Sequence, residues 1–148
     1  MRRRPALLIV AGFGIFVFLG LSFLLARGLT GGSAERGKVL DVLEAQARGD
    51  APAVLAQLPA CRAEPACATV TEARVAKLRR PGDVQILQYE PSTRLSLTRR
   101  TGTGRVAWRA GDALPVVQCV RVRREGPLTG AGVTLLALSD PIAPDGGC

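Results

Sequence analysis

The sequence has no histidine, and its 148 residues include only one tryptophan and one tyrosine. Histidine is the usual general base near neutral pH and the commonest metal ligand, so its absence disfavours hydrolytic triads and most zinc centres. Paired carboxylates, which acid–base catalysis would need, are missing from the predicted strands. The scarcity of aromatic residues also disfavours the stacking of single-stranded nucleic acid. We therefore predict a non-enzymatic protein with no catalytic residues, no metal, no cofactor and no sequence-specific nucleic-acid partner.

Charge is missing altogether from the 22 residues of 5–26, PALLIVAGFGIFVFLGLSFLLA. As a helix this run would span about 33 Å, enough to cross the hydrocarbon core of a bilayer. It is longer than the apolar core of a signal peptide, usually about 7–15 residues, and no A-x-A site follows it, so an uncleaved anchor is favoured over a cleaved signal peptide. Three arginines precede the run and one closely follows it, which predicts a cytoplasmic N-terminus. We expect a single-pass cell-membrane protein with a cytoplasmic stub (1–4), a transmembrane helix (5–26), a short flexible linker (27–33) and an extracytoplasmic domain (34–148).

The positive charge of the chain is concentrated around that run. Four of the 20 basic residues flank it, so the other 16 face 12 acidic residues, and this modest excess does not require a nucleic-acid partner. Arginines nevertheless gather on the predicted strands. They define a possible face for an anionic partner, made of Arg99, Arg105, Arg121 and Arg123. The alternative is an ordinary solvated sheet face with protected edges.

Helices are predicted over residues 34–48, 51–58 and 65–80. In the first of them, apolar residues recur on one face at helical spacing. Ser33 is a suitable N-cap for this helix, and Glu35 lies in its first turn, where the helix dipole favours an anion. Gly49 is a natural stop, and Asp50 can cap the second helix.

After Pro81-Gly82 the hydrophobic period changes to two, which is typical of strands. Short links of turn-forming composition, including TGTG at 101–104, predict an antiparallel meander. Helices followed by an antiparallel sheet make the fold class α+β, with two to three helices packed on a sheet of four to five strands. The strands are predicted over residues 84–89, 94–99, 105–110, 115–124 and 132–139.

Four cysteines, Cys61, Cys67, Cys119 and Cys148, all lie beyond the apolar run. A zinc site would need all four thiolates, and the spacings of 5, 51 and 28 intervening residues lack the usual C-x-x-C pairs. A thioredoxin-like redox couple would need the same motif. Disulfides suit the expected compartment, and proximity favours a Cys61–Cys67 bridge at the bend between the second and third helices. Cys119–Cys148 would then hold the C-terminus.

This order of elements resembles small membrane-anchored actinobacterial proteins of the NTF2-like (cystatin-like) superfamily. The resemblance covers about residues 34–140, and its carriers are ARGDAPAVLAQLPAC, the PAC that follows, and VVQCVRVRREG. It implies a curved sheet wrapped around helices, often with a pocket. Enzymes of this superfamily place acidic or histidine side chains in that pocket, whereas this chain has no histidine and almost no acids on its strands.

From these observations we expect a membrane-anchored binding or assembly module of the bacterial cell envelope. Its partners would be the lipid bilayer, through residues 5–26, and another envelope protein or an anionic envelope polymer. One alternative is an NTF2-like pocket that binds or converts a small ligand. Another is anionic-polymer binding through the arginine-rich sheet face.

Overall fold

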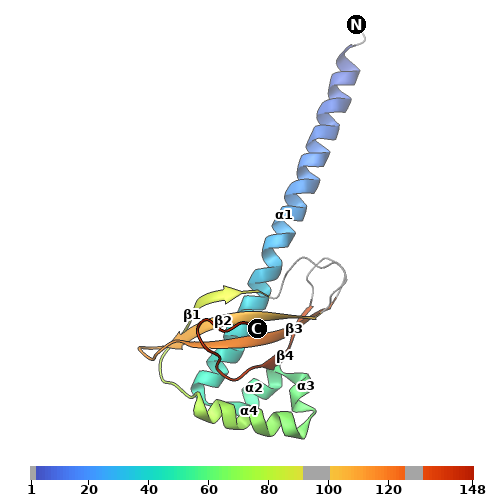
Figure 1. Cartoon of the computed structure of the whole chain (residues 1–148). Helices are drawn as coiled ribbons and strands as arrows, with labels where there is room; N and C mark the ends of the chain where they lie inside the picture. The colour runs from blue at the N-terminus through green and yellow to red at the C-terminus, as the bar shows by residue number, and fades with distance from the viewer. Residues whose placement is uncertain (1–2, 92–100, 126–131) are drawn as a thin grey trace.

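The computed structural model describes residues 3–91, 101–125 and 132–148, with side chains for 12–23, 33–91, 101–124 and 132–148. In this part of the chain, helices come first and strands follow (Figure 1). In chain order the elements are α1 (Arg3–Arg48), α2 (Ala51–Gln57), α3 (Pro59–Arg62), α4 (Pro65–Lys77), β1 (Val84–Glu90), β2 (Thr101–Ala110), β3 (Val116–Glu125) and β4 (Gly132–Leu138).

The four described strands form one antiparallel sheet in the order β1-β2-β3-β4. This confirms the α+β class and the antiparallel pairing, but β1 pairs directly with β2, whereas the predicted meander had the strand 94–99 between them. The expected strand at 94–99 lies outside the described residues. Figure 1 shows α1 behind the sheet and the C-terminal tail (139–148) in front of it. One face of the sheet is therefore covered by a helix and the other by the tail.

The predicted flexible linker at 27–33 is wrong, because α1 continues through it as a single helix of 46 residues. Ser33, expected as an N-cap, lies inside this helix. Starting a helix is costly, whereas extending one adds a hydrogen bond for each residue fixed. Strong helical segments on both sides can therefore keep the linker glycines in the helix, although each glycine lowers the stability of the helix by about 1 kcal/mol. As a result, the apolar run and the domain share one rod about 69 Å long.

The end of α1 follows the prediction closely. Gly49 has a φ of +79°, and Asp50 N donates to Ala45 O at 2.9 Å, which closes the helix. Asp50 Oδ1 then accepts from Ala53 N at 3.0 Å and caps α2. The four-residue helix α3 was not predicted, and α4 ends at Lys77 rather than at residue 80. After α4 the chain turns back toward α1, where Arg80 N donates to Ala47 O. Residues 78–80 therefore do not continue the helix.

The TGTG segment at 101–104 is part of β2 and not a turn. Its residues pair with Val120–Arg123 of β3, from Thr101 opposite Arg123 to Gly104 opposite Val120. Turn composition is a local preference, whereas a ladder of backbone hydrogen bonds to a distant strand is a tertiary one. Here the tertiary pairing decides the conformation.

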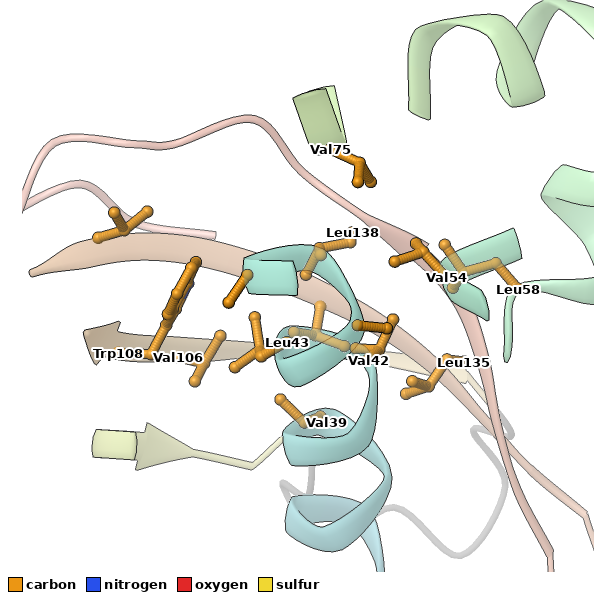
Figure 2. Close-up of a cluster of buried hydrophobic side chains, with 14 of the residues drawn as sticks. Val39, Val42, Leu43, Val54, Leu58, Val75, Val106, Trp108, Leu135 and Leu138 are labelled. Atoms are coloured by element: carbon orange, nitrogen blue, oxygen red, sulfur yellow. The ribbon is translucent and has the colours of Figure 1, made fainter. Parts of the chain in front are cut away.

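The core lies between α1 and the inner face of the sheet (Figure 2). Val39, Val42 and Leu43 of α1 are fully buried against Val106 and Trp108 of β2. Val54 of α2, Leu58 between α2 and α3, and Val75 of α4 cover another side of the core (Figure 2). One face of β3 points inward and carries Val116, Gln118, Val120 and Val122.

Candidate functional site

The N-terminal half of α1 projects away from the domain (Figure 1). Between residues 12 and 23, the exposed fractions of its large apolar side chains range from 47% at Val17 to 77% at Phe16. An apolar surface of this extent marks a site of interaction with a membrane or another molecule. Within the residues whose side chains are described, no helix is long and apolar enough to cross a membrane. The exposed set comprises Phe13, Ile15, Phe16, Val17, Phe18, Leu19, Leu21 and Phe23.

Where α1 enters the domain, three elements meet at one buried carboxylate. Glu35 of α1 is completely buried. Arg124 of β3 donates from Nη2 to Glu35 Oε2 at 2.6 Å, and the Tyr89 hydroxyl of β1 donates to Glu35 Oε1. We call these three residues the Glu35 clamp. The clamp ties α1 to two strands of the sheet at once.

The electrostatics of the clamp keep the tyrosine in its donating form. Burial raises the pKa of Tyr89 far above its usual range, and the hydrogen bond to Glu35 and the charge of Glu35 raise it further. The charge of Arg124 acts in the opposite direction but is the smaller effect. A phenol that stays protonated and the guanidinium of Arg124 both hold the carboxylate in place. The clamp therefore fixes the direction in which α1 leaves the domain.

Sequence reasoning missed this clamp. It placed Glu35 in the first turn of a helix, as an anion favoured by the helix dipole. A signal was present, however, because Glu35 precedes Val39, Val42 and Gln46 by four, seven and eleven residues and so shares their buried face. A carboxylate on a buried face needs a hydrogen-bonding or charged partner that is buried with it.

A second polar cluster lies inside the core, around Gln118. Its Oε1 accepts from Trp108 Nε1 at 2.8 Å and from Gln46 Nε2 at 3.0 Å, and its Nε2 donates to Ser139 O at 2.7 Å. Trp108 is fully buried, so it belongs to the core rather than to a ligand platform. Packed side chains therefore occupy this part of the interface between the sheet and α1.

A groove of about 520 Å³ opens at the edge of the sheet, where α1 passes β1. Its walls are mainly apolar, and Arg36 closes one side by donating from Nη2 to Ile86 O at 3.5 Å. The groove is wide enough for an apolar side chain or a short extended segment. It is lined by Ser33, Arg36, Gly37, Leu40, Val84, Gln85 and Ile86.

The predicted arginine face is only partly assembled. Arg99 lies outside the described residues, and Arg105 is engaged by the C-terminal tail. Arg105 donates to Gly146 O at 3.2 Å and to Pro144 O, and it lies 3.7 Å from Glu90 Oε1. It is therefore a structural residue and not a free cation. Arg121 and Arg123 are exposed, and their side chains make no hydrogen bond or ion pair to the residues that the structure describes.

A hollow of about 310 Å³ adjoins Arg121 on the outer face of the sheet. Ser139 Oγ at its rim accepts from Cys119 N at 2.8 Å and donates to Asp140 O, so this hydroxyl is already used. The hollow is lined by Thr103, Cys119, Arg121, Ala137, Leu138 and Ser139.

Both predicted disulfides are present. Cys61–Cys67 joins α3 to α4 with a Cα–Cα distance of 5.1 Å, and Cys119–Cys148 joins β3 to the last residue with a Cα–Cα distance of 5.7 Å. No cysteine is free, so no thiolate is available for zinc or for a dithiol couple. The second bridge holds the tail over the outer face of the sheet, where Ile142 N also donates to Val117 O at 2.8 Å.

The two disulfides should contribute unequally to stability. A bridge restricts the unfolded chain more when it closes a longer loop. The separations are 29 residues for Cys119–Cys148 and 6 for Cys61–Cys67, which correspond to about 3.5 and about 2 kcal/mol. We expect paired serine substitutions to lower the free energy of unfolding in that order. Urea denaturation in mild detergent, followed by the fluorescence of the single tryptophan, measures both losses, and the reverse order would contradict the prediction.

No protein-family model, no curated protein and no solved structure matches this chain. The resemblance to the NTF2-like superfamily therefore stays a prediction.

Proposed function

We propose that this chain is a membrane-anchored binding or assembly module of the bacterial cell envelope. In this proposal residues 5–26 cross the cell membrane, residues 1–4 lie in the cytoplasm and residues 34–148 lie on the extracytoplasmic side. The observation that carries the proposal is the exposure of the apolar half of α1.

The exposed side chains point in every direction around the helix. Residues 15–19 are consecutive, and at about 100° per residue they cover the full circumference. All five carry large apolar side chains that are at least 47% exposed. A partner protein with a groove would cover one stripe of such a helix, whereas a helix that is apolar all round suits surroundings that are apolar all round. Hydrocarbon meets that requirement without any specific partner.

Charge and cysteine chemistry support the proposed orientation. Three arginines precede the uncharged run, and positive residues favour the cytoplasmic side. Both disulfides belong to the domain that follows, and disulfides persist outside the cytoplasm.

A binding role is favoured over catalysis by how the described polar groups are used. Glu35 is held by Tyr89 and Arg124, and the Gln118 cluster is bonded within the core. What the domain offers to other molecules is its surface. The groove between α1 and β1 supports a second candidate function, the binding of a small apolar ligand or an extended segment, since its volume of about 520 Å³ falls in the range of ligand sites. An NTF2-like relationship, which we also propose, would suit this second candidate.

Fractionation and external proteolysis test the anchor and the orientation. We expect the chain to stay in the membrane pellet after alkaline carbonate extraction. We also expect protease added to intact spheroplasts to remove residues 34–148. A cytoplasmic protein that stays intact serves as the control. Release into the supernatant would overturn the anchor. Protection of the domain while other exposed domains are digested would overturn the orientation.

A further inference from the structure

We infer that Arg121 and Arg123 form a docking surface for the anionic headgroups of phospholipids in the membrane that holds α1. This inference rests on the proposed membrane anchor. It narrows the partner from any anionic polymer to the lipid surface next to the domain.

The two arginines share one open face of the sheet. Val120 and Val122 are buried in the core, so the alternating residues Arg121 and Arg123 face the other way and are exposed. Their cross-strand neighbours are small or neutral. On β2 and β4 these are Thr103 and Ala137 beside Arg121, and Thr101 and Thr134 beside Arg123.

These cross-strand neighbours do not neutralise the two guanidinium groups. None of the four carries a carboxylate, and each is shorter than an arginine side chain. Two cations on alternate positions of one face, with no ion pair to any side chain that the structure describes, attract anions through the sum of their charges. Arg105, on the same face of β2, differs because its guanidinium group already binds the tail carbonyls and Glu90. The surface open to a partner is therefore the Arg121–Arg123 end of the face.

This end of the sheet lies on the side from which α1 projects (Figure 1). Arg124, the residue after Arg123, binds Glu35 Oε2 at 2.6 Å, so the end of β3 is level with Glu35 of α1. Glu35 comes nine residues after Ala26, the last residue of the uncharged run, which corresponds to about 14 Å along the helix.

The spacing places the end of β3 close to the lipid phosphates. The headgroup layer on each side of a bilayer is about 5–8 Å deep. A helix that stands upright would therefore leave a gap of about 6–9 Å between the headgroups and the level of Glu35. That gap is comparable to the Debye length of about 8 Å at physiological ionic strength, and an arginine side chain shortens it further. A soluble polymer could meet the same charges, but the anchor keeps only lipid phosphates permanently close to them.

Chemical modification of arginine in nanodiscs tests the inference with the full chain. We would compare discs of phosphatidylcholine alone with discs of phosphatidylcholine and phosphatidylglycerol in equal parts. Phenylglyoxal modification of each arginine is followed by peptide mass spectrometry. In the anionic discs we expect Arg121 and Arg123 to react about fivefold more slowly. Arg62 of α3 is the internal control, because it is exposed on a part of the domain distant from the projecting half of α1, and its rate should not change. High salt should remove the protection.

Each other outcome has a definite meaning. Equal rates in the two kinds of disc, with the chain still bound to the discs, would overturn the lipid surface and leave the anchor intact. Failure of the chain to enter either disc would overturn the anchor and the inference with it. Inorganic phosphate or a soluble anionic polymer that protects both arginines as strongly in phosphatidylcholine discs would show a site for soluble anions instead.

A pair of variants gives a second readout. The natural chain, extracted from anionic membranes in mild detergent, should retain more phosphatidylglycerol than the Arg121→Gln, Arg123→Gln double variant. Arg62→Gln is the matched control and should retain as much as the natural chain. Equal retention by the natural chain and the double variant would contradict the inference.

Discussion

The Phe16→Arg, Phe18→Arg double variant should lose its attachment to the membrane. Both positions lie near the centre of the uncharged run, and an arginine at the centre of a membrane helix costs about 2.5–3.5 kcal/mol. Two arginines therefore oppose insertion by about 5–7 kcal/mol, enough to reverse the distribution between membrane and water. Because the natural side chains are 77% and 70% exposed, the substitutions remove no packing contact within the domain. The fraction of chain in the pellet after carbonate extraction measures the effect.

The control for this variant adds the same two charges to the domain. Val70 of α4 and Leu114, between β2 and β3, are the matched positions, with apolar side chains 53% and 81% exposed. The Val70→Arg, Leu114→Arg double variant should stay in the membrane fraction like the natural chain. If the Phe16→Arg, Phe18→Arg chain also stays there, residues 5–26 are not the anchor.

Removal of the buried carboxylate should have the largest effect on the stability of the domain. In the Glu35→Ala variant, the Arg124 guanidinium and the Tyr89 hydroxyl lose their shared acceptor. Breaking a buried ion pair on one side costs about 3–5 kcal/mol. Here the acceptor is fully buried, and the Arg124 side chain that loses it is only 30% exposed. Arg124 Nε already has no hydrogen-bond partner within the described residues, so the variant would leave this side chain still less satisfied. Urea unfolding followed by the fluorescence of Trp108, which is fully buried, measures the loss.

Two further variants separate the buried charge from general effects. Glu44→Ala removes a half-exposed carboxylate of the same helix, 3.9 Å from Arg48, and should cost less than about 1 kcal/mol. Glu35→Ala combined with Arg124→Met removes both charges, and it should recover a large part of the lost stability because no unpaired ion remains. Equal losses for Glu35→Ala and Glu44→Ala would show that the clamp does not contribute in this way.

Features set by neighbouring residues were predictable from the sequence. The stop at Gly49, the cap at Asp50 and the inward face of β3 follow from local rules about glycine, side-chain oxygens and alternation. The Cys61–Cys67 pairing was predictable because the two residues lie close in the chain, and with four cysteines this leaves a single second pair.

Features set by distant residues were not predictable from one sequence. The acceptor in the clamp is 54 residues from Tyr89 and 89 from Arg124. Arg105 is held by tail carbonyls 39 and 41 residues away, so the sequence placed it on a free face to which, of the described residues in that set, Arg121 and Arg123 belong. TGTG has the composition of a turn but pairs with β3, and the glycine-rich linker is helical because helices extend cooperatively from both sides.

Because α1 is unbroken, the number of residues between the apolar run and Glu35 sets how far the domain is rotated about the helix axis. Each residue of an α-helix turns the chain by about 100° and advances it by about 1.5 Å. One residue added to or removed from 27–33 would therefore turn the whole domain about the helix axis by more than a quarter of a circle, with almost no change in its height. Seven residues would bring it back to within about 20° of its starting direction. With the proposed anchor, the number of residues in that segment would decide which side of the sheet faces a neighbour in the plane of the membrane.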